Sequence, residues 1–482
     1  MGDPTPSSTA GCCHCNGKPE PPREIVLCFD GTGNTLGEGG ETNILKIFRV
    51  LDRTKENRSG IGTESAPVSF GGVPLNSRSS LLGSSKVLDM ALASSFDQHV
   101  LGGYRFLMRR YKPGAKIYLF GFSRGAYTAR FLSEMVDYTG LPKADNEELV
   151  PLIWKAFWTF RFRSEKKHHT ERYNAYRFLR TCRETLCNPV SRTHFLGLFD
   201  TVNSVAELKQ ECEGVPTARI IRHAVSIDER RLKFQPVLIS PRIGNRGNWL
   251  LEKNRKDQKN KGKDAADDVD SDSDDEDAVD LEEVYFAGDH SDVGGGHELE
   301  PAEMWPASHV PLVWMLGEAA KAGLTFNDNR LVWELGSEVS EPLPETIENE
   351  NSSRKSPVIE ASLNGVLHNS LDFDDSKNKM LTLFWRLLEI LPFKRLHSQP
   401  DGSQKLSRRP VRGGLARAIP RNSRVHGSVV TRLRKHNDYK PTNLTGVAEL
   451  RDAKNEAENW VCVDKGQVGE FWMRKEERLA SR

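Results

Sequence analysis

Short runs of apolar residues, each followed by glycine or aspartate, recur along the chain between Glu24 and Gly288. Each run is too short for a helix and lacks regular polar positions, which is typical of central strands in a parallel sheet. The pattern predicts four strands: EIVLCF at Glu24–Phe29, KIYLF at Lys116–Phe120, THFLGLF at Thr193–Phe199 and EVYFA at Glu283–Ala287.

Between these runs the apolar residues recur at helical spacing instead. The pattern predicts helices over Thr42–Leu51, where Thr42 can act as the N-cap, over Lys86–Tyr111, over Ala126–Val136 and over Pro311–Ala322. Strands that alternate with helices imply right-handed crossovers. The chain is therefore expected to be an α/β protein of the α/β-hydrolase type, with a doubly wound, mostly parallel sheet.

Changes in composition suggest how the chain is organised around that sheet. We predict a disordered tail over 1–22, a catalytic domain over 23–335, and a C-terminal extension over 336–482 that is partly disordered and packs in segments on the catalytic domain. An insertion at about 145–190 mixes aromatic with basic residues, which fits either ordinary packing of a helical subdomain or a cap over an active site. A second insertion, at about 253–281, turns from lysine-rich to aspartate-rich and should be a disordered loop.

Net charge and the lengths of the apolar runs limit the kinds of partner that the chain is expected to bind. The 482 residues carry a net charge of +1, so no basic excess points to nucleic acid. No apolar run is long enough to span a bilayer, and the first 22 residues lack the apolar stretch of a secretory signal. We therefore expect a cytoplasmic protein whose membrane contact is at most peripheral. The eight cysteines are scattered apart from Cys12-Cys13-His14-Cys15, whose thiols are either incidental or sites of palmitoylation.

The strongest chemical signal is Gly121-Phe122-Ser123-Arg124-Gly125, directly after one predicted strand and directly before a predicted helix. That context is the one in which G-x-S-x-G forms a nucleophile elbow. The turn lifts the serine hydroxyl above the sheet and directs the helix N-terminus towards it. Ser123 is therefore the predicted nucleophile.

A serine needs a base to take its proton, and in this class an acid and then a histidine follow it along the chain. Asp200 ends a predicted strand and is the candidate acid. His290 follows the next predicted strand and precedes a glycine-rich bend, so it is the candidate base. His223, His297 and His426 are rivals, and His426 is the most serious because a late histidine also satisfies the order.

The loop Asp30-Gly31-Thr32-Gly33-Asn34 ends the first predicted strand. Its glycines permit close backbone approach, so Gly31 or Thr32 can donate a second oxyanion N–H beside that of Arg124. No lysine followed by serine or threonine comes after the glycines, so the loop is not a P-loop.

Two other functional classes stay open at this stage. Asp30, Asp289 and Asp292 are hard oxygen ligands that could build a metal-dependent phosphoesterase. Alternatively, the charge-segregated insertion and the basic C-terminal region could recruit partners to a non-catalytic scaffold. The hydrolase hypothesis explains more residues with fewer assumptions, and it requires no metal and no cofactor.

Five longer motifs follow one another along the chain. They are FDGTGN at Phe29–Asn34, GFSRGAYTAR at Gly121–Arg130, GLFDTV at Gly197–Val202, HAVSIDERR at His223–Arg231 and FAGDHSDVGGG at Phe286–Gly296. Together they resemble the catalytic domain shared by type VI secretion phospholipase effectors and by uncharacterised fungal proteins of the α/β-hydrolase type. The resemblance covers roughly Glu24–Leu324 and implies hydrolysis of esters, including phospholipid acyl esters. It also implies Ser123, Asp200 and His290 as the catalytic triad of a serine esterase or lipase with a lipid or small ester substrate, while the oligomeric state stays open.

Overall fold

A computed structural model describes the chain over residues 23–31, 40–52, 62–63, 84–163, 165–188, 190, 192–202, 217–239, 279–301, 303–336, 357–373, 379–390, 395–398, 404–407, 414–452, 459–465 and 468–475. Several predicted features lie outside these residues. They are the tail over 1–22 with its cysteine cluster, Thr32, and the second insertion up to 278.

The centre of the fold is a mixed sheet of nine described strands in the order β12-β13-β11-β8-β7-β6-β3-β1-β2. Neighbours from β2 to β11 pair in parallel, and β13 then pairs antiparallel with both β11 and β12. The protein is thus α/β with a large, mostly parallel sheet. The strands are β1 (Glu24–Phe29), β2 (Gly62–Thr63), β3 (Lys116–Phe122), β6 (Thr193–Phe199), β7 (Ala218–Ser226), β8 (Asp280–Phe286), β11 (Arg424–His426), β12 (Trp460–Val463) and β13 (Phe471–Arg474).

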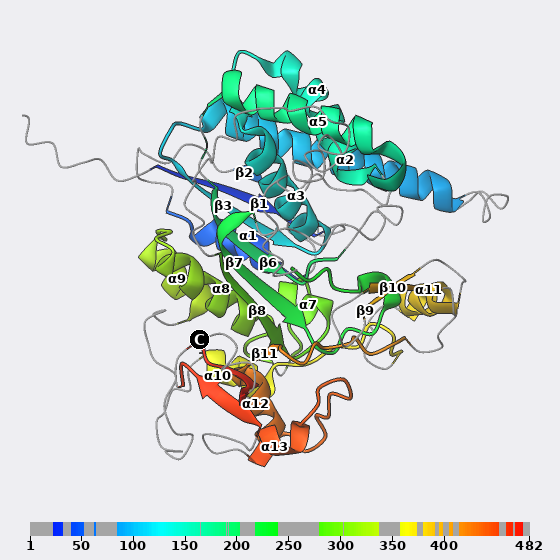
Figure 1. The fold of residues 1–482 in the computed structure, drawn as a ribbon. Helices are drawn as coiled ribbons and strands as arrows, with labels where there is room; N and C mark the ends of the chain where they lie inside the picture. The colour runs from blue at the N-terminus through cyan, green and yellow to red at the C-terminus, as the bar shows by residue number, and fades with distance from the viewer. Residues whose placement is uncertain are drawn as a thin grey trace, which may run out of the picture.

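Helices cover both faces of this sheet (Figure 1). Because successive side chains of a strand point to opposite faces, Leu27 of β1 joins one core and Val26 joins the other. The first core lies under α2 (Ser84–Arg110), α3 (Arg124–Thr139), α4 (Val150–Phe162) and α5 (Glu165–Thr185). The second lies under α1 (Asn43–Val50), α8 (His309–Lys321), α9 (Asp328–Leu335) and α10 (Pro357–Asn364).

Several shorter elements complete the described fold. Two two-stranded sheets are formed by β4 (Leu141–Pro142) with β5 (Cys187–Asn188) and by β9 (Arg395–Ser398) with β10 (Gln404–Ser407). The remaining described helices are η1 (Glu147–Leu149), η2 (Leu232–Phe234), α7 (His290–Gly294), α11 (Lys379–Ile390), α12 (Gly427–Lys435) and α13 (Val447–Asp452). No described helix combines the length and the apolar character that crossing a bilayer requires.

The four predicted strands and the predicted helices are present. The sequence reading placed no strand at β2, β11, β12 or β13. It also missed β7, since Arg222 and His223 interrupt its apolar run. Arg222 is neutralised by Asp280 and by Glu318, neither of which lies near it in sequence. The end of the predicted disordered insertion is also wrong, because Asp280 already belongs to β8 and pairs with Ile220.

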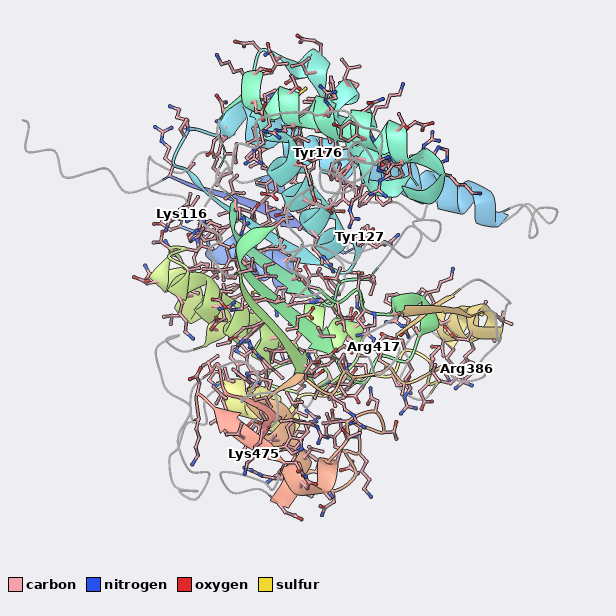
Figure 2. All side chains as sticks on the ribbon, in the orientation of Figure 1. Lys116, Tyr127, Tyr176, Arg386, Arg417 and Lys475 are labelled. Atoms are coloured by element: carbon pink, nitrogen blue, oxygen red, sulfur yellow. The ribbon has the colours of Figure 1, made fainter. Side chains whose placement is uncertain are left out.

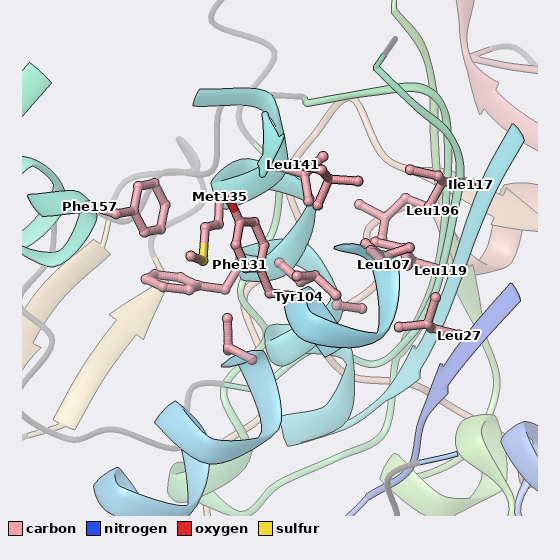
Figure 3. Close-up of a cluster of buried hydrophobic side chains, with 14 of the residues drawn as sticks. Leu27, Tyr104, Leu107, Ile117, Leu119, Phe131, Met135, Leu141, Phe157 and Leu196 are labelled. Atoms are coloured by element: carbon pink, nitrogen blue, oxygen red, sulfur yellow. The ribbon is translucent and has the colours of Figure 1, made fainter. Parts of the chain in front are cut away.

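The aromatic residues of the first insertion pack into the core. Phe157 of α4 is fully buried, and its ring lies 5.2 Å from that of Phe131 on α3 (Figure 3). Trp154 and Phe162 also contact Phe131. These contacts support the interpretation of the insertion as a packed helical subdomain.

Part of the C-terminal extension continues the sheet. Strand β11 pairs in parallel with β8 through Val425 and Tyr285, and β13 and β12 follow on its other side. A third core of buried apolar residues joins β7 and β8 to α12 and α13. The C-terminal segments are therefore integrated with the sheet rather than folded apart from it.

Candidate active site

Ser123 stands at a sharp turn between β3 and α3. Its backbone has φ 59° and ψ −123°, an unusual conformation for a residue with a side chain. Among the described non-glycine residues only Ser123, Asp200 and Asp464 have positive φ. Although Ser123 is the N-cap of α3, its hydroxyl makes no capping hydrogen bond, so it is not committed to the helix.

The two glycines of the motif are required by close packing around the turn. A Cβ at Gly121 would lie 2.4 Å from the Cα of Ala126. A Cβ at Gly125 would lie 2.1 Å from the carbonyl oxygen of Phe29, the last residue of β1. Only residues without a side chain allow α3 to begin this close to the strands.

The turn that carries Asp200 is bonded directly to the turn that carries Ser123. The N–H of Ser123 donates to the carbonyl of Phe199 at 3.0 Å, and the N–H of Val202 donates to the carbonyl of Ser123 at 3.4 Å. Asp200 itself has φ 39° and is fully buried. The parallel pairing of β3 with β6 therefore places the predicted acid beside the predicted nucleophile.

His290 completes the group from the end of β8. Its Nδ1 lies 2.6 Å from Oδ2 of Asp200, a short charge-assisted hydrogen bond. The centroid of its ring lies 4.6 Å from that of Phe122, the residue before Ser123, in a tilted contact, and 4.8 Å from that of Phe234, in an edge contact. With Nδ1 held by Asp200, Nε2 is the nitrogen left to exchange a proton with another group.

The motif HAVSIDERR holds the loop before His290. The hydroxyl of Ser226 donates to the carbonyl of Gly288 at 2.7 Å, and the N–H of Gly288 donates to Asp228 at 2.7 Å. The N–H of His290 donates to Glu229 at 3.3 Å. These contacts explain why β7 and its following loop belong to the site although they hold none of the predicted catalytic residues.

Arg417, from the C-terminal extension, is a site residue that the sequence reading missed (Figure 2). Its guanidinium donates to both oxygens of Asp200, at 2.6 Å and 2.8 Å, and also to the carbonyls of Ser226 and Phe234. Its side chain is fully buried. Nothing in the local sequence distinguishes it from the other arginines of a basic region, so no sequence signal identifies it.

The charge of Asp200 depends on this partner. Burial alone would raise the pKa of the carboxyl, but the charge and hydrogen bonds of Arg417, with those of His290, hold it well below its usual range. Asp200 is therefore an anion at neutral pH. A charged, fixed carboxylate on Nδ1 of His290 orients the imidazole.

The rival histidines are engaged elsewhere. In His426, Nδ1 contacts Ser428 and Nε2 contacts the carbonyl of Val468, and burial lowers its pKa to about 4. His223 receives the N–H of Thr201 on one nitrogen and contacts Glu283 with the other. His297 contacts Asp289 at 3.3 Å. Of the four, His290 is the one bonded to Asp200.

The expected oxyanion donors differ in their availability. Arg124 is the first residue of α3, so its N–H has no acceptor within the helix. The N–H of Gly31, in contrast, donates to Oδ1 of Asp30 at 2.6 Å, which leaves it engaged in this structure. The structure thus offers the helix N-terminus, rather than Gly31, as the donor beside Ser123.

The three aspartates of the phosphoesterase hypothesis have separate partners. Oδ2 of Asp30 accepts from the hydroxyl of Thr42 at 2.6 Å. Asp289 and Asp292 form a capping box at the start of α7, where each side chain accepts the backbone N–H of the other residue. These contacts give no support to a shared metal site built on Asp30.

Comparison with known proteins identifies a family. The family model described as the catalytic domain of Tle1-like type VI secretion phospholipase effectors matches residues 23–318. An uncharacterized protein of Saccharomyces cerevisiae, YEL023C, is 25% identical over 560 aligned positions, which cover 88% of this chain and 80% of that protein.

Two solved structures are also similar at low identity. One is the Tle1 effector bound to the VgrG spike from the type VI secretion system, at 15% identity with a TM-score of 0.32, covering 80% of this chain and 85% of that one. The other is an uncharacterized protein from Pseudomonas aeruginosa, at 18% identity with a TM-score of 0.31, covering 63% of this chain and 46% of that one.

Proposed function

Since this chain belongs to the family of Tle1-like phospholipase effector catalytic domains, we propose that it is a serine hydrolase of lipid esters with an α/β-hydrolase fold. The single observation that carries the proposal is the joining of three chain segments at one place. Ser123 stands in a strained strand-to-helix turn bonded to the turn of Asp200, and Asp200 is bonded to His290 at 2.6 Å.

In the proposed reaction the Oγ of Ser123 attacks the ester carbonyl while Nε2 of His290 takes its proton. The oxyanion is stabilised by the N–H of Arg124 and by the N-terminus of α3. The C–O bond to the alcohol then breaks, and His290 returns the proton to the leaving oxygen. Water, activated by the same imidazole, hydrolyses the acyl-enzyme and restores Ser123.

Labelling with a fluorophosphonate, which reacts with activated serines, tests this assignment directly. The full chain should be labelled, and Ser123→Ala should abolish labelling. Ser291→Ala is the matched control, because it removes a hydroxyl next to His290 without touching the proposed nucleophile. Labelling that survives in Ser123→Ala would show that the nucleophile is elsewhere or that the chain is a scaffold.

An exposed apolar stripe near the site supports a lipid rather than a small soluble ester as substrate. Met380, Leu383 and Leu387 lie on one side of α11 and are 76%, 43% and 53% exposed. On the same helix Trp385 lies 5.4 Å from the ring of Phe234, which in turn contacts His290. Helix α11 is thus connected to the proposed base through two side chains, Trp385 and Phe234.

Changing this stripe separates lipid-surface action from chemistry. Met380→Asp with Leu387→Asp should reduce hydrolysis of phospholipid vesicles by roughly 10-fold or more, because each buried apolar side chain contributes about 1.5–3 kcal/mol. Hydrolysis of a short soluble ester should be unchanged. Trp333→Asp, on the exposed face of α9, is a matched control that should alter neither rate. Equal loss on both substrates would contradict a role in lipid contact.

A further inference from the structure

Ligand-type side chains gather beside α7. One ligand atom each of Asp292 in the α7 turn, His297 of the following loop and His368 of the C-terminal extension lie within 4.8 Å of one another. Asp289 contacts His297, and the four residues are here called the Asp–His cluster. His368 Nδ1 lies 2.7 Å from Oδ1 of Asp292. His297 Nε2 lies 3.3 Å from Oδ1 of Asp289 and 4.0 Å from Oδ1 of Asp292.

The carboxylates are already oriented by other donors. Oδ2 of Asp292 accepts the N–H of Asp289 at 2.9 Å and that of His368 at 2.8 Å. Oδ2 of Asp289 accepts the hydroxyl of Ser370 at 2.8 Å. Oδ1 of Asp292 therefore faces both histidines, and its carboxylate is held by outer hydrogen bonds as metal-ligating carboxylates are. Oδ1 of Asp289 also accepts the N–H groups of Ser291 and Asp292.

The two imidazoles lie together beside one carboxylate. The rings of His297 and His368 are stacked, with centroids 3.9 Å apart and an interplanar angle of 22°. Both rings thus present a nitrogen towards Asp292. One divalent cation bound by neutral imidazoles would neutralise the carboxylates beside them.

We propose that the Asp–His cluster binds one divalent transition-metal ion, and that this ion holds the loop of His290 to the C-terminal extension. The two imidazoles and the carboxylate of Asp292 are three donors of the kinds that bind zinc in proteins. Nitrogen donors argue against calcium and magnesium, which prefer oxygen alone.

The site would act on catalysis only through position. Asp289 and Asp292 stand on either side of His290 in sequence, and His368 is 76 residues after Asp292. An ion bound by Asp292, His297 and His368 would fix α7 to the C-terminal extension, while Arg417 holds Asp200, the partner of His290. The proposal does not depend on the chain being a hydrolase, because its readouts are metal content and thermal stability.

The test uses the full chain with Cys12, Cys13 and Cys15 replaced by serine, so that the N-terminal thiols contribute no metal. After dialysis against a chelator, zinc is added back and bound metal is measured by mass spectrometry. We expect about one tightly bound equivalent and a rise in Tm on adding zinc. Cobalt in place of zinc should give visible absorption bands of a low-coordinate site.

Variants assign the bound metal to the cluster. His297→Gln and His368→Gln should each weaken zinc binding by at least ~10-fold, and the double variant should lose both the bound equivalent and the rise in Tm. His168→Gln is the control, because this half-buried histidine of α5 is not part of the cluster, and it should bind zinc as the parent does.

Two results would overturn the proposal. One is a parent chain that takes up no zinc, which would show that the cluster is an ordinary hydrogen-bonded ion-pair network. The other is a double variant that keeps its full equivalent, which would place the metal elsewhere.

Discussion

Methionine has an unbranched side chain like that of arginine but no guanidinium. Arg417→Met therefore removes the positive charge beside Asp200 and leaves the carboxylate fully buried. The carboxylate would lose two hydrogen bonds, of 2.6 Å and 2.8 Å, and keep those from the N–H of Ser226 and from His290. Removing one partner of a buried ion pair costs about 3–5 kcal/mol, because the remaining charge stays unpaired. We expect a loss of that size in the free energy of unfolding.

A double-mutant cycle distinguishes the ion pair from general packing. In Arg417→Met with Asp200→Asn neither charge remains, so the double variant should be more stable than the sum of the two single losses predicts, by at least ~1.5 kcal/mol. Urea denaturation followed by tryptophan fluorescence measures all four proteins. The control is Arg432→Met, because Arg432 is also buried but donates to the carbonyls of Ser362 and Gly365.

The same variant makes a prediction about pH. A carboxyl whose folded pKa is depressed stabilises the protein above its unfolded pKa of about 3.9, and this stability is lost as the pH falls towards the folded value. Burial raises the pKa of Asp200, and the charge of Arg417 opposes that effect. Without Arg417 the pKa of Asp200 therefore rises. Acid unfolding and the acid limb of kcat/KM should therefore both move to higher pH. Additive single losses, or an unchanged acid limb, would refute the role given to Arg417.

Three further predictions follow from particular residues. Gly125→Ala should lower the free energy of unfolding by more than ~3 kcal/mol or prevent folding, since the new Cβ would lie 2.1 Å from a backbone oxygen. In Gly317→Ala, in helix α8, the new Cβ would meet no atom within 4 Å, so this control should stabilise the protein by about 0.5–1 kcal/mol in urea denaturation. Burial raises the pKa of Asp228 to about 6, so its stabilising contribution is present below the unfolded pKa and is lost as the pH rises through 6. Asp228→Asn should therefore leave the free energy of unfolding unchanged near about pH 4 and increase it near about pH 8. Equal effects at both pH values would contradict this prediction. Fluorophosphonate labelling should be lost in His290→Gln and kept in His426→Gln, and the reverse pattern would make His426 the base.

The C-terminal extension connects to the site at several points. Arg417 reaches Asp200, His368 reaches Asp292, and Tyr439 donates to Asp228 at 2.9 Å. Since these contacts come from residues beyond the part matched by the family model, we propose that the functional unit includes the extension. The sequence reading placed a domain boundary at 335. In the structure, strands from both sides of that position belong to one continuous sheet.

The sequence alone determined those features that depend on neighbours along the chain. The apolar runs of β1, β3 and β6 are local patterns, and they identify strands buried on both faces without any other information. The elbow at Ser123 is likewise local, because the two glycines are required by a turn of five residues. Asp200 and His290 could be predicted because parallel strands end at the same edge of a sheet.

The tertiary structure decided the features that depend on residues far apart in the chain. Arg417 is 217 residues from Asp200, and in sequence it looks like any solvated arginine of a basic region. Strand β7 was hidden because the partners that neutralise Arg222 come from β8 and α8. The physical reason is the same in both cases: a buried charge is stable only beside its opposite charge, and packing rather than local sequence sets which residues meet.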